Sequence, residues 1–120
     1  MFINVELLKS KNACHSQVSL FKKLFPNGVV VTTDLCIEYY NKFSWNWAAR
    51  NLLSKTGWKE YDKIRVAAYN EYKKTKDAAW GEYRKIHDVA MVEYLKIHDV
   101  AWVEYLKLCA KTFGKLAVNS

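Results

Sequence analysis

The second half of the chain repeats one pattern of apolar and polar positions every eleven residues. Eleven residues make three turns of α-helix, so equivalent positions return to the same face. No proline interrupts the pattern, and it predicts one long helix over residues 58–120. The copies begin at Trp58, Tyr69, Trp80, Met91 and Trp102, and a partial sixth begins at Phe113.

Each copy carries the same types of side chain in the same columns. The fourth position is always Tyr, the seventh is mostly aliphatic, and the last is Ala in four of the five copies. These three columns fall close together on a helix and form an apolar stripe, which the aromatic first column widens. Val89 and Val100, at the tenth position, widen the stripe on its other side. A period of 3.67 residues per turn predicts that helices packed along this stripe wind in a right-handed sense.

The stripe needs a partner, because the 57 residues that precede it are too few to cover it. Three solutions are open: self-association into a helical bundle, a fold-back near Gly81, or a groove on another protein. We favour self-association, since identical faces suit a symmetric interface. The residues expected in the partner or oligomer interface are Trp58, Tyr61, Tyr72, Trp80, Tyr83, Ile86, Tyr94, Ile97, Trp102 and Tyr105.

Helix caps and turns alternate in the first 57 residues, which predicts a small helical head. The expected order is a helix capped by Ser10 or Asn12 that ends by Phe25, a turn at Pro26–Gly28, an extended link at 29–31, a helix over 34–41 capped by Thr32 or Thr33, and a helix over 45–53 capped by Ser44. The fold class is therefore all-α, with a head at 1–57 and a long repeat helix at 58–120 that forms a right-handed coiled coil or bundle.

The head offers a small set of core candidates. Trp45 and Trp47 are two residues apart and cannot face one way on a helix, so one of them should reach the long helix or a partner. The expected core residues are Leu7, Leu8, Val18, Phe21, Leu24, Leu35, Ile37, Phe43, Trp47 and Leu52.

Composition narrows the cellular setting more than the function. The net charge of +7 is spread along the chain, which permits contact with nucleic acid without specifying it. Three cysteines without a CxxC motif indicate reduced thiols. No apolar stretch approaches the ~20 residues of a membrane span, and the first residues do not resemble a signal peptide. We therefore expect a cytoplasmic protein with no membrane contact.

The repeated Ile-His-Asp triplets are the best candidates for chemistry, and they are weak ones. His87 and His98 lie about 16 Å apart along a helix, so one ion cannot bind both. The tyrosines recur at the same ~16 Å, too far apart for stacking on successive bases. Catalytic and phosphate-binding motifs are absent from the sequence. We expect no catalytic residue, no metal and no cofactor, and we do not favour nucleic acid as a partner.

A resemblance adds a context. The head carries Leu7-Leu8, Asn12-Ala13-Cys14 and Phe43-x-Trp45-x-Trp47-Ala48-Ala49, followed by Glu-Tyr repeats. In these features the chain resembles small uncharacterised proteins encoded by phages, prophages and bacteria. The resemblance implies a mobile-element context and no mechanism.

These observations favour a non-enzymatic interaction protein that forms a homo-oligomer and binds another protein. The context of the resemblance suggests an inhibitor or modulator of a host or anti-phage defence complex, acting in the host cytoplasm. The alternatives are a basic nucleic-acid-binding protein and a structural component of a phage particle.

Overall fold

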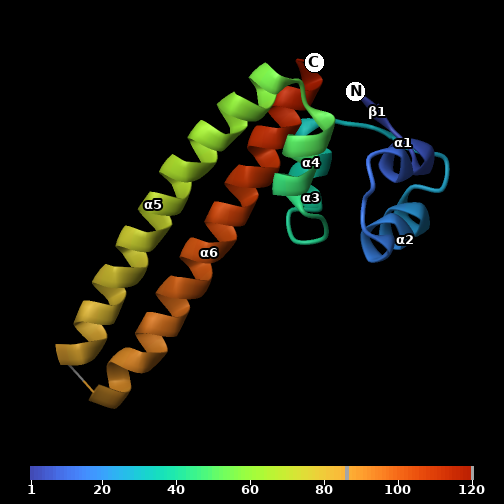
Figure 1. Ribbon diagram of the computed structural model, residues 1–120. Helices are drawn as coiled ribbons and strands as arrows, with labels where there is room; N and C mark the ends of the chain where they lie inside the picture. Colours follow the sequence, from blue (N-terminus) through green and yellow to red (C-terminus); the bar gives the residue numbers. More distant parts are fainter. Residues whose placement is uncertain (86, 120) are drawn as a thin grey trace.

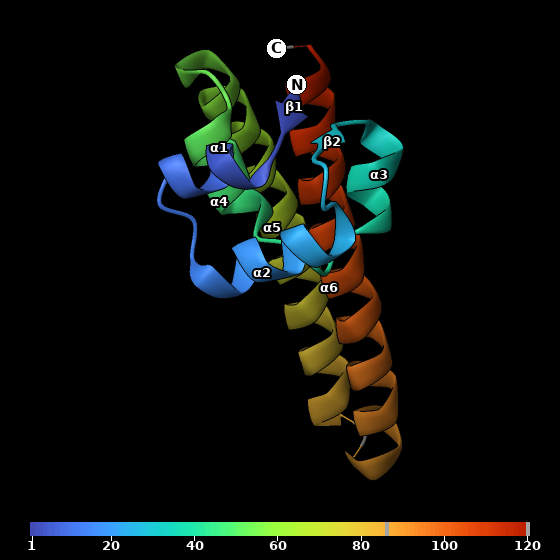
Figure 2. The ribbon, with the colours of Figure 1, turned by 90° about the vertical axis from the view of Figure 1, so that its right-hand side faces the viewer.

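Two long helices dominate the computed structural model, which describes residues 1–85 and 87–119, with side chains for 1–85 and 91–119. Helix α5 (Lys55–Lys85) and helix α6 (His87–Val118) run antiparallel and side by side (Figure 1). The smaller elements gather at one end of this pair, where α5 begins and α6 ends (Figure 2). The all-α fold with a helical head is confirmed.

The repeat region is a hairpin and not one unbroken helix. The chain reverses direction between Lys85 and His87, so the fold-back is present. The reversal comes later in the chain than the expected fold-back near Gly81, which instead lies inside α5. A Cβ at Gly81 would meet nothing within 4 Å, so this glycine has no packing role. One glycine costs a helix only about 1 kcal/mol against alanine, which the packing of α5 on α6 can offset. The position of Gly81 therefore did not predict where the chain reverses.

Four short helices and one pair of two-residue strands make the head. Helices α1 (Val5–Ser10), α2 (His15–Leu24), α3 (Thr33–Glu38) and α4 (Trp45–Leu52) follow one another along the chain. Strand β1 (Phe2–Ile3) pairs antiparallel with β2 (Val29–Val30), with Phe2 opposite Val30. The expected extended link at 29–31 is thus partly paired with the N-terminus.

The predicted caps of α3 and α4 are confirmed, and that of α2 is wrong. The hydroxyls of Thr32 and Ser44 accept hydrogen bonds from the third residue beyond each. By contrast, Ser10 ends α1, and Cys14 precedes α2 without a side-chain cap. Asn12 adopts a φ of 62°, a left-handed conformation that asparagine tolerates, and it separates the two helices. The polar residues near 10–12 therefore mark a boundary between helices.

The head packs against the last turns of α6. Trp45 packs on Phe113 with ring centroids 5.5 Å apart and ring planes tilted by 40°, so Trp45 is the tryptophan that reaches the long helix. Cys36 of α3 lies against Gly114, and a Cβ added at Gly114 would lie 3.1 Å from its Sγ. The Tyr61 hydroxyl donates to Oδ1 of Asn46 at 2.6 Å and ties α5 to α4. Of the expected core residues, Leu8, Val18 and Phe21 are buried, and Leu7, Phe43, Trp47 and Leu52 pack against the core.

Candidate protein-docking groove

Aromatic side chains from the first and fourth columns of the repeat close the hairpin. Trp80 of α5 faces Tyr94 of α6 with ring centroids 5.5 Å apart. Tyr72 faces Trp102 with ring centroids 5.2 Å apart, about two helical turns nearer to the head. Tyr69 and Tyr105 follow at 5.6 Å. The columns that the sequence marks as an apolar stripe therefore pair with each other inside one chain.

The expected interface residues divide into covered and accessible sets. Tyr61, Tyr72 and Tyr105 are buried between α5, α6 and the head, and Trp58, Tyr83 and Tyr94 are half-buried. Trp80, Ile97 and Trp102 stay about two-fifths exposed, and Ile86 lies outside the described residues. A partner that binds the closed hairpin can therefore use only part of the expected set.

Tyr72 and His98 share a hydrogen bond across the hairpin. The hydroxyl oxygen of Tyr72 lies 2.6 Å from Nε2 of His98, and Nδ1 of His98 lies 3.4 Å from Asp99. Burial raises the pKa of the Tyr72 phenol. His98 thus helps to join the two helices, while the side chain of His87 lies outside the described part of the chain. Among the described residues, no three His, Cys, Asp or Glu side chains cluster as metal ligands would.

A groove of about 580 Å³ runs along one face of the hairpin between α5 and α6. Its floor is apolar, with Val100 58% exposed, Ile97 40% and Leu108 39%. The sequence placed Val100 beside the stripe but left it and Leu108 out of the interface. The residues lining the groove are Ala68, Glu71, Tyr72, Thr75, Glu93, Lys96, Ile97, Val100, Ala101, Glu104, Tyr105 and Leu108.

The groove exists because the apolar stripe is wider than one neighbouring helix can cover. The aromatic first column of α6 faces α5, as Trp102 does against Tyr72. The seventh and tenth columns, with Leu108 and Val100, lie beside that contact and remain exposed. A helix that buries only two columns of a three-column stripe leaves an apolar edge, which a further helix can cover.

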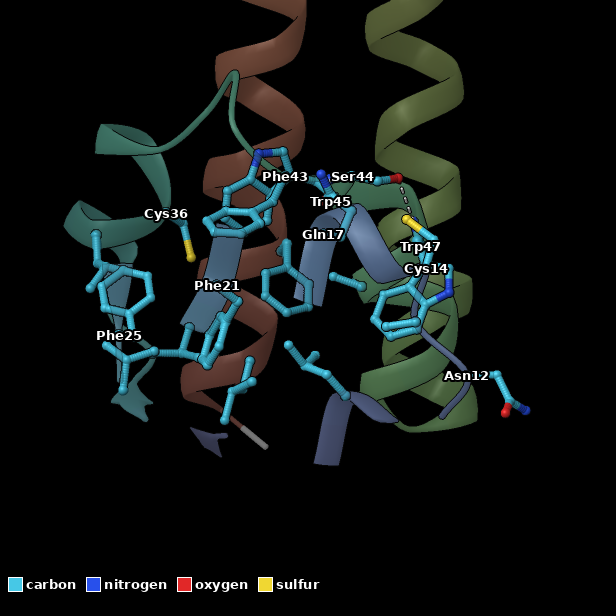
Figure 3. A pocket seen from close by; sticks show the side chains of 18 residues that line it. Asn12, Cys14, Gln17, Phe21, Phe25, Cys36, Phe43, Ser44, Trp45 and Trp47 are labelled. Atoms are coloured by element: carbon cyan, nitrogen blue, oxygen red, sulfur yellow. Dashed lines mark hydrogen bonds between the residues drawn. The ribbon is translucent and has the colours of Figure 1, made fainter. Parts of the chain in front are cut away.

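A second hollow of about 420 Å³ lies in the head (Figure 3). Aromatic side chains, among them Phe21, Phe43 and Trp45, gather around it, and Asn12 points away from them. Gln17 also lines it, but its amide is engaged with the backbone: Oε1 accepts from Ser44 N at 3.0 Å and Nε2 donates to Lys42 O at 3.3 Å.

Two thiols border this hollow and differ in exposure and in the direction of their pKa shifts. A hydrogen bond with the Ser16 hydroxyl lowers the pKa of exposed Cys14. Burial raises the pKa of the Cys36 thiol to about 11. Neither thiol has a general base among its hydrogen-bond partners in the described structure. The lining of the hollow is therefore mainly apolar.

None of the helices in the described residues combines the length and apolar character needed to cross a membrane. Protein-family models, curated proteins and solved structures give no match to this chain. The resemblance to small phage-encoded proteins therefore stays a prediction, and any function must be argued from the groove itself.

Proposed function

We propose that this chain is a non-enzymatic protein–protein interaction module whose α5–α6 groove receives an amphipathic helix from a partner protein. The observation that carries the proposal is the apolar floor of the groove. Ile97, Val100 and Leu108 are spaced along one face of α6, and all three remain exposed after the hairpin has closed. An apolar helix laid into such a groove would complete a three-helix arrangement.

The rim of the groove defines the charge expected of the partner. Glu71, Glu93 and Glu104 border the floor, and Lys96 is the basic residue among the lining. The groove is therefore acidic although the whole chain has a net charge of +7. We expect a partner helix with aliphatic residues at i, i+3 or i+4, and i+7, flanked by Lys or Arg.

The most concrete version of this function comes from the resemblance of the sequence to phage and prophage proteins. In that context the partner would be a component of a host or anti-phage defence complex, which the chain inhibits or modulates by occupying a helix-binding surface. The support for the target class is the resemblance, and the support for the binding mode is the groove.

The test compares two valine-to-glutamate variants on the same helix. Val100→Glu puts a charge on the groove floor, while Val92→Glu changes a valine that is 68% exposed and does not line the groove. Tagged wild-type chain and both variants are used to capture proteins from nuclease-treated host lysate. Val100→Glu should lose a partner that wild type and Val92→Glu both retain. Equal capture by the two variants would refute docking in the groove.

The net positive charge of α5 supports nucleic acid as a second candidate partner. Helix α5 has nine Lys or Arg and five Asp or Glu, a net charge of +4, whereas α6 has four of each. Binding to α5 should weaken steeply with salt and should disappear on nuclease treatment. Gel shifts at two salt concentrations test it, and Val100→Glu should leave such binding intact because it lies in the groove.

A further inference from the structure

We propose that two copies of this chain exchange their α6 helices, so that α5 and α6 of each copy become one continuous helix in a dimer. The exchange would involve the contacts inside the hairpin and not the groove, so it does not depend on the docking function. The partner in this case is a second copy of the same chain.

The first support is a segment that occurs twice in the sequence. Residues 82–90 read EYRKIHDVA and residues 93–101 read EYLKIHDVA, so they differ only at Arg84 and Leu95. The second occurrence lies wholly within α6 and is helical throughout. The first occurrence spans the place where α5 ends and α6 begins. The same residue sequence is therefore fully compatible with an uninterrupted helix.

The sequence around the reversal also lacks the residues that end helices. Glycine or asparagine commonly follows the last turn of a helix, and proline often stands just beyond it. From 82 to 113 the sequence contains none of these three residues. The eleven-residue period also continues through the reversal without insertion or deletion. The reversal therefore depends on the packing of α5 against α6, and not on a local stop signal.

Three of the aromatic contacts across the hairpin are centred on residue 87. Trp80 and Tyr94 lie seven residues before and after it. Tyr72 and Trp102 lie fifteen residues on either side, and Tyr69 and Tyr105 eighteen. Two antiparallel copies related by a two-fold axis at residue 87 can therefore make each of these pairs between chains. A closed two-fold interface of this kind is the commonest form of homodimer.

We expect one exposed apolar side chain beside the reversal to be more covered in the exchanged dimer, because both helices continue past it. Met91 is 51% exposed near the reversal of the hairpin, and it stands in the same column as Trp80 and Trp102. Met91 and Tyr83 each lie four residues from residue 87, so Met91 of one copy would come opposite Tyr83 of the other. The same register holds in the hairpin, so any added burial of Met91 would come from the helical turns that continue beyond residue 87 in the dimer.

The head would be completed by the helix of the other copy. Phe113 and Gly114 of α6 pack against Trp45 and Cys36 in the closed chain. In the exchanged dimer the same contacts form between chains, so each head keeps its neighbours. The two forms then differ in the segment around residue 87 and in the cost of association, and protein concentration decides between them.

The test is a spin-label distance measurement that separates contacts within a chain from contacts between chains. The labelled protein carries Lys59→Cys and Lys115→Cys, two exposed positions placed 28 residues on either side of residue 87, and Cys14→Ser, which removes the exposed native thiol. In the closed hairpin these labels sit on helices packed about 10 Å apart. In a continuous helix they are separated by roughly 84 Å.

The protein is refolded from denaturant at high concentration, alone and with a large excess of unlabelled chain, and the dimer is isolated by size. Light scattering should give twice the chain mass of 14.0 kDa. The short label distance should be present in the undiluted dimer and lost after dilution with unlabelled chain. A dimer that keeps the short distance after dilution, or a chain that stays monomeric throughout, would overturn the proposal.

Two further variants examine the role of the reversal. Inserting Asn-Gly-Gly between Lys85 and Ile86 supplies a helix end and breaks the eleven-residue phase. It should raise the dimer dissociation constant about tenfold or more, since each glycine disfavours a continuous helix. Gly81→Ala is the matched control. Residue 81 is helical in the hairpin and would be helical in the dimer, so this substitution should leave the dissociation constant unchanged. Equal dimer fractions for the insertion and the control would contradict the exchange.

Discussion

Two glycines in the same column of the repeat, each inside a long helix but in different surroundings, should respond oppositely to the same substitution. Gly81 lies in α5, and an added Cβ there would meet nothing within 4 Å. Gly114 lies in α6, and an added Cβ would lie 3.0 Å from Cα of Thr33 and 3.1 Å from Sγ of Cys36. The backbone of Thr33 cannot rotate away as a side chain can, so α3 would have to move.

The magnitudes follow from helix propensity and packing. Replacing glycine with alanine in a helix interior stabilises by about 1 kcal/mol, and Gly81→Ala should show this gain in full. At Gly114 the same gain is opposed by an overpacking cost of about 1–3 kcal/mol. The net effect of Gly114→Ala should be a loss of about 1 kcal/mol. For a chain of this size each kcal/mol moves the Tm by roughly 4 °C, so the two variants should differ by roughly 8 °C.

Urea unfolding followed by far-ultraviolet circular dichroism measures both free energies under the same conditions. The free energy of unfolding of wild type should lie between those of the two variants if α3 approaches α6 as closely as described. Gly114→Ser extends the series, since its larger side chain should cost more than alanine at the same site. A Gly114→Ala protein as stable as Gly81→Ala would refute the packing of the head on α6.

Three further outcomes follow from burial and protonation. Burial raises the pKa of Tyr61, so the folded state disfavours its phenolate. The free energy of unfolding should therefore stay constant below pH ~10 and fall above it. Tyr61→Phe should reduce that fall. The lowered pKa of Cys14 and the raised pKa values of Cys36 and Cys109 predict one iodoacetamide adduct on the native chain and three after unfolding, counted by mass spectrometry. Phe113 is 1% exposed, so Phe113→Ala should lower the free energy of unfolding in urea by about 3–5 kcal/mol. A loss under about 1 kcal/mol would contradict the place of Phe113 in the core.

Local chemistry explains which elements of the head could be predicted. Thr32 and Ser44 cap their helices through hydrogen bonds to residues three positions away, so the signal lies within a few residues of sequence. The two-residue spacing of Trp45 and Trp47 predicted that one of them would reach the long helix or a partner, because residues two apart on a helix face different neighbours, and the structure shows that it is Trp45. In both cases the geometry of one helix was sufficient.

The remaining parts of the head depend on contacts between distant residues. Strand β1 has two residues and pairs with β2 some 27 positions later, and nothing in Phe2 and Ile3 indicates that pairing. The helix α1 has six residues, too few for a periodic pattern. Asn12 resembles a helix cap in the sequence but takes a left-handed conformation in the structure. Asparagine suits both roles, so residue type alone could not decide.

The groove was only half predictable, because the sequence shows the width of an apolar stripe but not how much of it a neighbour covers. The sequence alone does not distinguish the fourth-column tyrosines from the seventh-column aliphatic residues as interface candidates. In the fold, Tyr72 and Tyr105 turn into the contact between α5 and α6, and Ile97 and Leu108 remain at its edge. The difference arises from the angle at which the two helices meet, which depends on all their contacts together.

The repeat itself explains why the hairpin could not be distinguished from an assembly of long helices. Each aromatic pair across the hairpin joins columns that exist in every copy, so a partner from the same chain and one from a second chain offer the same side chains. A partner within the chain is held at high effective concentration, which favours the hairpin in dilute solution. In the exchange that we propose, a second chain would supply the same faces at the cost of association. The sequence therefore specifies which faces pair, and in that proposal the protein concentration would decide which chain supplies the partner.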